Sequence, residues 1–253
     1  MSSFSPPDFL LGYWHDGFNL KNHLQDFLQI DTPTLETRLE EGQAALAQLG
    51  RHDFDWTRAT EFYRDQVGAA HLFDLGAWHL SSQDYIGDTL QLVATFAQGK
   101  VLDFGGGIGT HAIAAALCPQ VEQVIYCDIN PMNRDFVAKR VTELGLSQKI
   151  QCVLSVPEAT SFDTIICFDV LEHLPDPSQQ LLKFHKLLTP KGKAIVNWYF
   201  FKGQNQEFPF HLDDPQLMSK FFNVLRQNFQ EVFHPYFITA RCYQKAGTAP
   251  LVS

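Results

Sequence analysis

The stretch that most constrains the fold is residues 101–116, VLDFGGGIGTHAIAAA. An apolar run ends in an acid, three consecutive glycines and a fourth follow, and small helix-forming residues come next. Glycine costs backbone entropy and removes side chains, so this cluster indicates a turn that another group approaches closely. Such turns between a strand and a helix hold anionic or polar ligands against the helix N-terminus. We therefore expect a ligand site at this turn.

From about residue 83 onward, short apolar runs alternate with amphipathic helical segments, which predicts an α/β fold with a doubly wound, mostly parallel sheet. The last two of the seven expected strands are too close together for a crossover helix, so they should pair antiparallel. Asn130-Pro131 and Asp214-Pro215 are typical helix starts. A further helix is expected over 178–188, ended by a turn at Thr189-Pro190-Lys191-Gly192. The expected strands cover residues 101–104, 124–128, 150–156, 164–168, 193–199, 231–233 and 238–244.

Residues 1–82 have a different pattern, because they show no strand signal and are rich in aromatic residues and histidine. Helices are expected over 34–49, 56–67 and 71–80. So short a segment should pack onto the main domain as an N-terminal helical cap or substrate lid, leaving 83–253 as the second domain. Its aromatic residues fit either a plain hydrophobic core or a substrate pocket.

Composition excludes several classes of function. The 253-residue chain has a net charge of −9 and no dense basic block, so nucleic acid is not an expected partner. No apolar run reaches the roughly 20 residues of a membrane span, and the N-terminus lacks signal-peptide features, so we expect a soluble cytoplasmic protein. The five cysteines form no C-x-x-C pair, and the ten histidines show no H-x-x-x-H spacing, so no metal site is expected.

The spacing of the glycines separates two cofactor classes. The dinucleotide fingerprint G-x-G-x-x-G needs a third glycine where this chain, counted from Gly105, has Thr110. The spacing is instead D-x-G-x-G-x-G, with Asp103 ahead of the first glycine. A carboxylate there would repel a pyrophosphate but attract the ammonium group of a bound amino acid. The loop therefore favours a cationic ligand, and an NAD-dependent oxidoreductase remains as the alternative.

Four blocks in order resemble the class I S-adenosylmethionine-dependent methyltransferases over about residues 83–244. They are VLDFGGGIG, YCDIN, FDTIICFDVLEHLPDP and LLTPKGKAIV. The resemblance implies a Rossmann-like, seven-stranded sheet with the last strand antiparallel. It also implies S-adenosylmethionine as cofactor, S-adenosylhomocysteine as product, and methyl transfer to an O, N or C nucleophile of a small organic molecule. The FDVLEHL block is similar to that of quinone-biosynthesis and natural-product methyltransferases. A cofactor-binding accessory protein without catalysis stays open, because these motifs specify binding alone.

The same resemblance implies roles for individual residues. Asp103 would orient the loop and the amino group of the cofactor, and Asp128 would accept both ribose hydroxyls. Ile129 would lie against the adenine. The third strand lacks the acid or amide that often reads the adenine amino group, and Ser155 or a backbone carbonyl is the substitute. The residues expected to approach the methionine portion and the sugar are Gly105, Gly107, Gly109, Phe168 and Asp169.

The acceptor should meet the cap and residues 198–214, because ligands of open α/β sheets bind beyond the carboxyl ends of the strands. The apolar, aromatic character of 198–214 favours a small organic acceptor. Three histidines, His79, His173 and His211, are the candidates for a general base, although each also fits a structural role. Trp78 or Tyr85 could face the sulfonium. The oligomeric state does not follow from the sequence.

Overall fold

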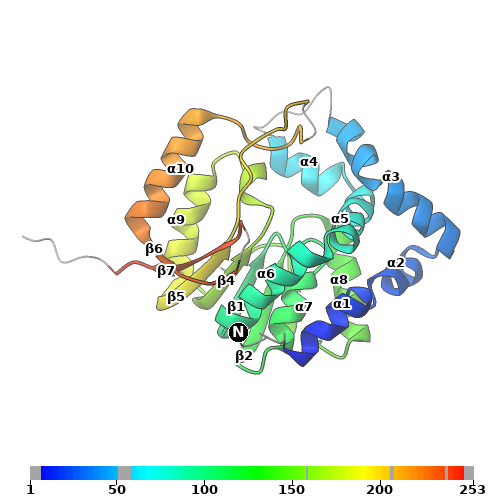
Figure 1. Cartoon of the computed structure of the whole chain (residues 1–253), viewed down its shortest axis with the longest axis horizontal. Helices are drawn as coiled ribbons and strands as arrows, with labels where there is room; N and C mark the ends of the chain where they lie inside the picture. The colour runs from blue at the N-terminus through cyan, green and yellow to red at the C-terminus, as the bar shows by residue number, and fades with distance from the viewer. Residues whose placement is uncertain (1–6, 51–57, 158, 206–207, 237–238, 248–253) are drawn as a thin grey trace, which may run out of the picture.

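The computed structural model describes residues 7–50, 58–157, 159–205, 208–236 and 239–247. Its centre is a seven-stranded sheet in the order β3-β2-β1-β4-β5-β7-β6. Helices cover both faces of this sheet (Figure 1). The strands are β1 (Gly99–Phe104), β2 (Val121–Cys127), β3 (Ile150–Val153), β4 (Phe162–Cys167), β5 (Leu188–Val196), β6 (Phe229–Val232) and β7 (Arg241–Lys245).

Strands β1 to β5 pair in parallel, and β7 pairs antiparallel with both β5 and β6. The predicted fold class is therefore confirmed, including the antiparallel last strand. Strand β5 begins earlier than expected, because Leu188 pairs with Phe162 before the register shifts. The segment Thr189-Pro190-Lys191-Gly192, which was expected as a turn, thus lies within the strand.

Three helices start at side-chain caps, and the sequence indicated two of these, Asn130 and Asp214. They are α8 (Pro131–Glu143), α9 (Pro177–Leu187) and α10 (Pro215–Asn228), each with proline in its first turn. The side chains of Asn130, Asp176 and Asp214 accept hydrogen bonds from free backbone amides of that turn. These contacts satisfy groups that the helix itself leaves unpaired, so helix position is encoded locally here.

Alternating residues of the strands build two cores, one on each face of the sheet. One face packs against α6 (Gln83–Phe96), α7 (Thr110–Leu117) and α8. The other face packs against α9 and α10 through residues such as Phe184 and Phe221. Because both faces are buried, the middle residues of the central strands are mainly apolar, as is usual in parallel sheets.

The N-terminal region is helical, as predicted. Its elements are η1 (Asp8–Leu10), α1 (Leu11–Asp16), α2 (Leu20–Leu28), α3 (Thr32–Gly50), α4 (Ala59–Asp65) and α5 (Ala70–Ser81). Helices α2, α3 and α5 share a hydrophobic cluster with Ile108 and with Phe136 of α8. The start of the helix predicted over 56–67, and the first residue of the strand predicted over 238–244, lie outside the described residues.

The first helices also pack on the sheet domain itself. Leu10, Tyr13 and Phe18 belong to the same core as α6 and α7. The fully buried guanidinium of Arg140 donates to the carbonyl oxygens of Gly17 and Phe18 and to that of Ile108 in the glycine loop. The N-terminal segment is thus attached to the glycine loop. The domain boundary at residue 82 remains a prediction.

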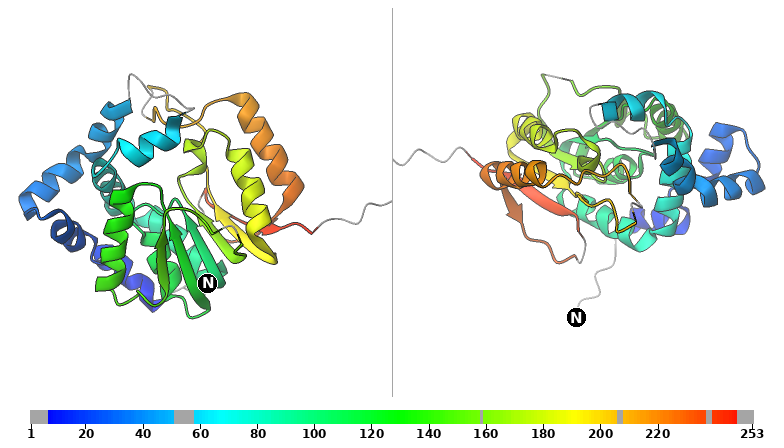
Figure 2. Two further views of the ribbon diagram at one scale, coloured as in Figure 1. Left: turned by 180° about the vertical axis from the view of Figure 1, so that it is seen from behind. Right: turned by 90° about the horizontal axis from the view of Figure 1, so that it is seen from above.

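The carboxyl ends of the parallel strands lie at the upper edge of the sheet in Figure 1, where α4 and the segment between β5 and α10 meet (Figures 1 and 2). This is the edge at which open α/β sheets bind ligands. Among the described residues, no helix has the length and apolar character needed to cross a membrane.

Candidate functional site

The glycine loop follows β1 and leads into α7. Gly105, Gly107 and Gly109 have φ values of +69°, +53° and +80°, a region that side chains strongly disfavour. Gly106 is required for a different reason: a Cβ atom there would lie 2.6 Å from the Asp103 carboxylate and from the Tyr126 ring. The loop is therefore held against these two side chains by close packing as well as by backbone conformation.

Asp103 lies at the end of β1 beneath this loop and is 2% exposed. Its Oδ2 atom has no hydrogen-bond partner within the described structure. Burial, with a smaller contribution from the nearby Asp128 carboxylate, raises the pKa of Asp103 to about 7. A buried carboxyl oxygen without a partner is costly, so this atom is suited to a cationic or hydrogen-bond-donating ligand.

Asp128 follows β2 and is also buried. Its Oδ2 accepts from the backbone amide of Gly107 at 2.9 Å, and its Oδ1 accepts from that of Asn130 at 2.8 Å. Asn133 adds a longer contact at 3.3 Å. Burial raises the pKa of Asp128 to about 6 against the opposing effect of these hydrogen bonds. The carboxylate thus couples the glycine loop to the end of β2.

The two residues expected near the adenine lie at the edge of this site. Ile129 is half-buried, and its carbonyl oxygen accepts from the Arg134 guanidinium at 2.9 Å. Ser155 is exposed in the bend after β3. The structure therefore places both beyond the strand ends on the β2–β3 side, as the predicted adenine site requires.

Phe168 and Asp169 follow β4. The Phe168 ring packs on the His111 ring, with 4.5 Å between centroids. Asp169 has a φ of +54°, and Asn197 holds it there through two reciprocal hydrogen bonds of 2.6 Å. Asn197 also donates to the Tyr85 hydroxyl at 2.9 Å. This strained backbone is therefore fixed by an asparagine at the end of the neighbouring strand, β5.

His79 is buried next to α7, the helix that follows the glycine loop. Its ring lies 5.9 Å from that of His111, and its Nδ1 has no hydrogen-bond partner in the described structure. Burial lowers the pKa of His79 well below its usual value, with His111 and Arg140 adding to the effect. His79 is thus a neutral, enclosed imidazole. Trp78 beside it is 44% exposed and contacts Tyr85, with 5.9 Å between ring centroids.

His173 and His211 come together although they are distant in the chain. Their rings are perpendicular, with 4.8 Å between centroids. His173 lies in η3 (Leu171–His173), and its Nδ1 contacts the Tyr63 hydroxyl of α4 at 2.9 Å. The Tyr199 and Phe208 rings pack against His211. This second cluster combines residues from the cap, from η3 and from 198–214. The cap and 198–214 were the segments expected to meet the acceptor.

Several residues of the site were not singled out from the sequence. His111 and Asn197 occupy ligand-side positions after the glycine loop and after β5, and Glu172 is buried beside His173. Leu75 of α5 lies over the loop, where a Cβ at Gly107 would come within 2.8 Å of it. The positions of His111, after the glycine loop, and Asn197, after β5, could have indicated from the sequence that both lie near the site. Nothing in the local sequence indicated that α5 covers the loop.

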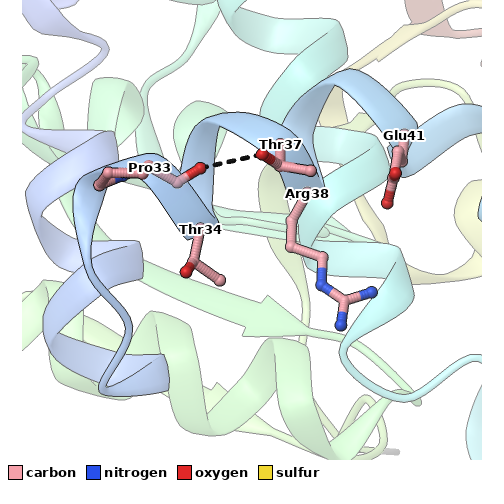
Figure 3. Close-up of a pocket in the computed structure, with 5 residues that line it drawn as sticks. All are labelled: Pro33, Thr34, Thr37, Arg38 and Glu41. Atoms are coloured by element: carbon pink, nitrogen blue, oxygen red, sulfur yellow. Dashed lines mark hydrogen bonds between the residues drawn. The ribbon is translucent and has the colours of Figure 1, made fainter.

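A pocket of about 440 Å³ lies elsewhere, on the outer surface of α3 (Figure 3). Its lining comes from that helix alone, and the hydrogen bond drawn there joins the Thr37 hydroxyl to the Pro33 carbonyl within one turn. It contains none of the residues described above around the glycine loop or in the cluster of His173 and His211. The lining residues are Pro33, Thr34, Thr37, Arg38 and Glu41.

Comparisons with known proteins agree with this arrangement. Residues 102–194 match the family described as a methyltransferase domain. The chain is 32% identical over 102 residues to the ubiquinone biosynthesis O-methyltransferase of Idiomarina loihiensis, which covers 39% of this chain and 41% of that protein. It is 32% identical over 124 residues to methyltransferase str2 of Strobilurus tenacellus. That match covers 49% of this chain and 44% of the relative. The matched segments thus span less than half of these relatives.

Solved structures share the fold. An O-methyltransferase family protein from Burkholderia thailandensis superposes with a TM-score of 0.56 at 15% identity, covering 85% of this chain and 71% of that one. The mitomycin 7-O-methyltransferase MmcR gives 0.54 at 14% identity, covering 84% and 68%. The sheet and its flanking helices are therefore those of the Rossmann-like methyltransferase fold. Within this fold, residues 102–194 are the part of the chain that matches the methyltransferase domain family.

Proposed function

We propose that this protein transfers the methyl group of S-adenosylmethionine to a hydroxyl oxygen of a small, largely apolar organic molecule. The observation that carries this proposal is the pair of buried carboxyl groups, Asp103 and Asp128, on either side of the glycine loop. Two acids at this position favour a ligand that is cationic and has hydroxyl donors, and they disfavour a pyrophosphate.

The residues present fit that cofactor. The unpartnered Oδ2 of Asp103 is suited to its ammonium group, directly or through water. Asp128 has lone pairs left for ribose hydroxyls beyond the bonds it accepts from the loop. The loop glycines provide the close backbone approach, with Ile129 and Ser155 toward the adenine and with Phe168 and Asp169 toward the methyl group. Leu75 lies over Gly107, so α5 would form the cover of the bound cofactor.

When bound, S-adenosylmethionine supplies a methyl group that its sulfonium has already activated for displacement. The contribution of the chain is then alignment of the acceptor in a site that excludes water. Asn197 and Tyr85 fix Asp169 at the end of β4. The cluster of His173, His211 and Glu172 would lie beside the acceptor hydroxyl that loses its proton. Burial lowers the pKa of both imidazoles and so keeps them neutral.

A hydroxyl acceptor is supported by the relatives, several of which are O-methyltransferases by name. An apolar acceptor is supported by the ring contacts among Tyr199, Phe201, Phe208 and His211. Trp78 and Tyr199 are large, exposed rings. Exposed aromatic rings beside a buried polar cluster suit a ligand with an apolar body and one reactive hydroxyl.

Calorimetry with Asp128→Ala tests the proposal. We expect the variant to bind S-adenosylmethionine about 100-fold more weakly, equivalent to about 2.7 kcal/mol, because charge-assisted hydrogen bonds to the ribose are lost. Asp135→Ala, which removes an exposed carboxylate from the following helix α8, should bind like the unaltered protein. Equal affinity of the Asp128 variant and the unaltered protein would refute the assigned cofactor site.

Two further measurements address the alternatives. A thermal shift with S-adenosylmethionine and S-adenosylhomocysteine, and none with NAD, is expected of the proposed cofactor and excludes an oxidoreductase. Transfer of a labelled methyl group into small molecules of a cell extract distinguishes an enzyme from a cofactor-binding accessory protein. Binding without transfer to any extracted compound would count against catalysis.

A further inference from the structure

Glu172, His173 and His211 form a cluster of three potential metal ligands. Each side chain offers one metal-ligating atom, and the three atoms lie within 4.8 Å of one another. Glu172 is buried, whereas the two histidines are half-buried. Two imidazoles and one carboxylate are a set of donors that zinc and other divalent transition metals bind in proteins.

Both imidazoles are held in the tautomer that metal binding needs. The Nδ1 atom of His173 lies 3.2 Å from the carbonyl oxygen of Phe210, and that of His211 lies 3.2 Å from the carbonyl oxygen of Phe201. A carbonyl oxygen can only accept, so these contacts favour a proton on Nδ1 and leave the lone pair on Nε2. The Tyr63 hydroxyl, 2.9 Å from the same Nδ1 of His173, can also accept that proton. Metal-ligating histidines are typically oriented by such a contact on the second ring nitrogen.

Glu172 provides the independent observation. Its side chain is 1% exposed, and its Oε2 atom has no hydrogen-bond partner in the described part of the chain. A buried carboxyl oxygen without a partner, beside two imidazole rings, is an arrangement that a cation would stabilise.

We propose that Glu172, His173 and His211 bind one divalent transition metal ion, with Zn²⁺ as the probe. Bonds of about 2.0–2.2 Å require the donors to approach each other more closely than in the ligand-free arrangement. His211 lies in the segment between β5 and α10, so a small movement of that segment brings the site together. Three protein ligands leave a coordination position open for water or a substrate oxygen, as in catalytic zinc sites.

The role of the ion rests on the proposed function, although its binding does not. A metal ion at the carboxyl end of β4, beside the segment expected to meet the acceptor, would take the acceptor hydroxyl as a ligand. Coordination lowers the pKa of a bound hydroxyl, so its proton is released to water and the oxygen is prepared as a nucleophile. The metal proposal thus narrows the acceptor to a molecule with a hydroxyl that can reach this cluster.

The experiment measures metal content and affinity with the full chain. The protein is stripped with a chelator, re-equilibrated with Zn²⁺, freed of unbound metal and analysed by mass spectrometry for zinc per chain. Substitution with Co²⁺ provides visible absorption that reports the ligand geometry. The variants are Glu172→Gln, which keeps the shape of the side chain, and His211→Ala in the half-buried segment. His15→Ala, which removes an exposed histidine on α1, is the matched control.

We expect about one zinc per chain in the unaltered protein and in the His15 variant, as one three-ligand site requires. Both cluster variants should bind Zn²⁺ at least about tenfold more weakly, while circular dichroism shows them folded. Absence of zinc from the unaltered protein, or equal affinity in the cluster variants, would overturn the proposal. S-adenosylmethionine binding by the same samples is the separate readout: its presence without zinc refutes only the metal site, and its absence refutes the proposed function.

Discussion

The two sides of the candidate site are built in different ways. The cofactor side consists of the glycine loop with the acids at the ends of β1 and β2, and its contacts join neighbouring strands of one sheet. The acceptor side consists of Tyr63, Glu172, His173 and His211, and the Tyr63–His173 contact alone bridges 110 residues of chain. The first side depends on local backbone conformation, whereas the second depends on how separate segments pack.

This difference indicates how each side can vary. A loop with positive φ at three glycines accepts few other residues, so its chemistry is restricted to ligands that fit the backbone. A cluster assembled from cap, η3 and the segment after β5 can change its side chains without disturbing the sheet. Specificity for the acceptor is therefore expected to come from the second side, and cofactor binding from the first.

The largest effect should come from Gly109→Ala on the cofactor side. Gly109 has a φ of +80°, and a Cβ atom there would lie 2.9 Å from two methyl groups of Val137. Backbone strain and overpacking together should lower the free energy of unfolding by about 2–3 kcal/mol and weaken cofactor binding. Urea unfolding and calorimetry measure the two effects.

Gly145→Ala is the matched control for this substitution. Gly145 has a φ of +70° at the end of α8, but nothing lies within 4 Å of the added Cβ. Only the cost of the left-handed conformation remains, about 1 kcal/mol, with cofactor affinity unchanged. Equal costs at the two positions would show that the loop tolerates a side chain and would remove the proposed constraint on the cofactor side.

The pH dependence of cofactor binding tests the role of Asp103 on the cofactor side. The folded-state pKa of Asp103 is raised to about 7, so in the ligand-free protein its contribution to stability is fully present below about pH 4 and lost as pH rises through 7. A cationic ligand prefers the ionised form. Its affinity should therefore increase with pH by up to about tenfold per unit below 7 and level off above.

Calorimetry in buffers with different ionisation enthalpies measures how many protons are released when S-adenosylmethionine binds at about pH 6. Asp103→Asn should abolish the Asp103 part of that release, leaving the smaller part from Asp128, whose pKa is raised to about 6. An affinity that is independent of pH between 5 and 8 in the unaltered protein would contradict a direct or water-mediated contact of Asp103 with the ammonium group.

The smallest effect should come from Tyr63→Phe on the acceptor side. This change removes the hydroxyl that contacts His173 but keeps the ring packed against Phe62 and His71. Loss of one hydrogen bond should lower the free energy of unfolding by about 1 kcal/mol and leave cofactor affinity unchanged. Denaturant unfolding and calorimetry are the measurements.

Tyr13→Phe, which removes a buried hydroxyl bonded to the His79 carbonyl, provides a stability control of similar size. Methyl transfer should fall in the Tyr63 variant and not in the Tyr13 variant once an acceptor is known. A tenfold loss of cofactor affinity in Tyr63→Phe would mean that the two sides are coupled, and the contrast drawn between them would fail.

Much of the fold could be predicted, because its signals are local. Caps at Asn130 and Asp214 fixed helix starts, and the seven strands appear near their predicted places with the predicted directions. The error at Thr189–Gly192 has a physical reason: residues typical of a turn were taken into β5 by pairing with β4 across a register shift. Pairing partners outweighed local propensity there.

The meeting of His173 and His211 shows the limit of spacing arguments. No metal site was expected, since no H-x-x-x-H pattern occurs in the sequence. His173 and His211 nevertheless meet, because η3 follows β4 while the segment containing His211 follows the adjacent β5. Residues beyond the carboxyl ends of neighbouring parallel strands converge whatever their separation in sequence, so a search by spacing along the chain cannot find them.

The sequence by itself determined the sheet, the left-handed glycine turns and the acids beside them, because backbone conformation and strand ends are set by residues close in the chain. Only the tertiary structure decided that Leu75 of α5 covers the glycine loop, that Arg140 joins the first helices to it, and that Tyr63 meets His173 and His211. Those contacts depend on the packing of one buried face against another, and many sequences with the same local pattern could pack differently.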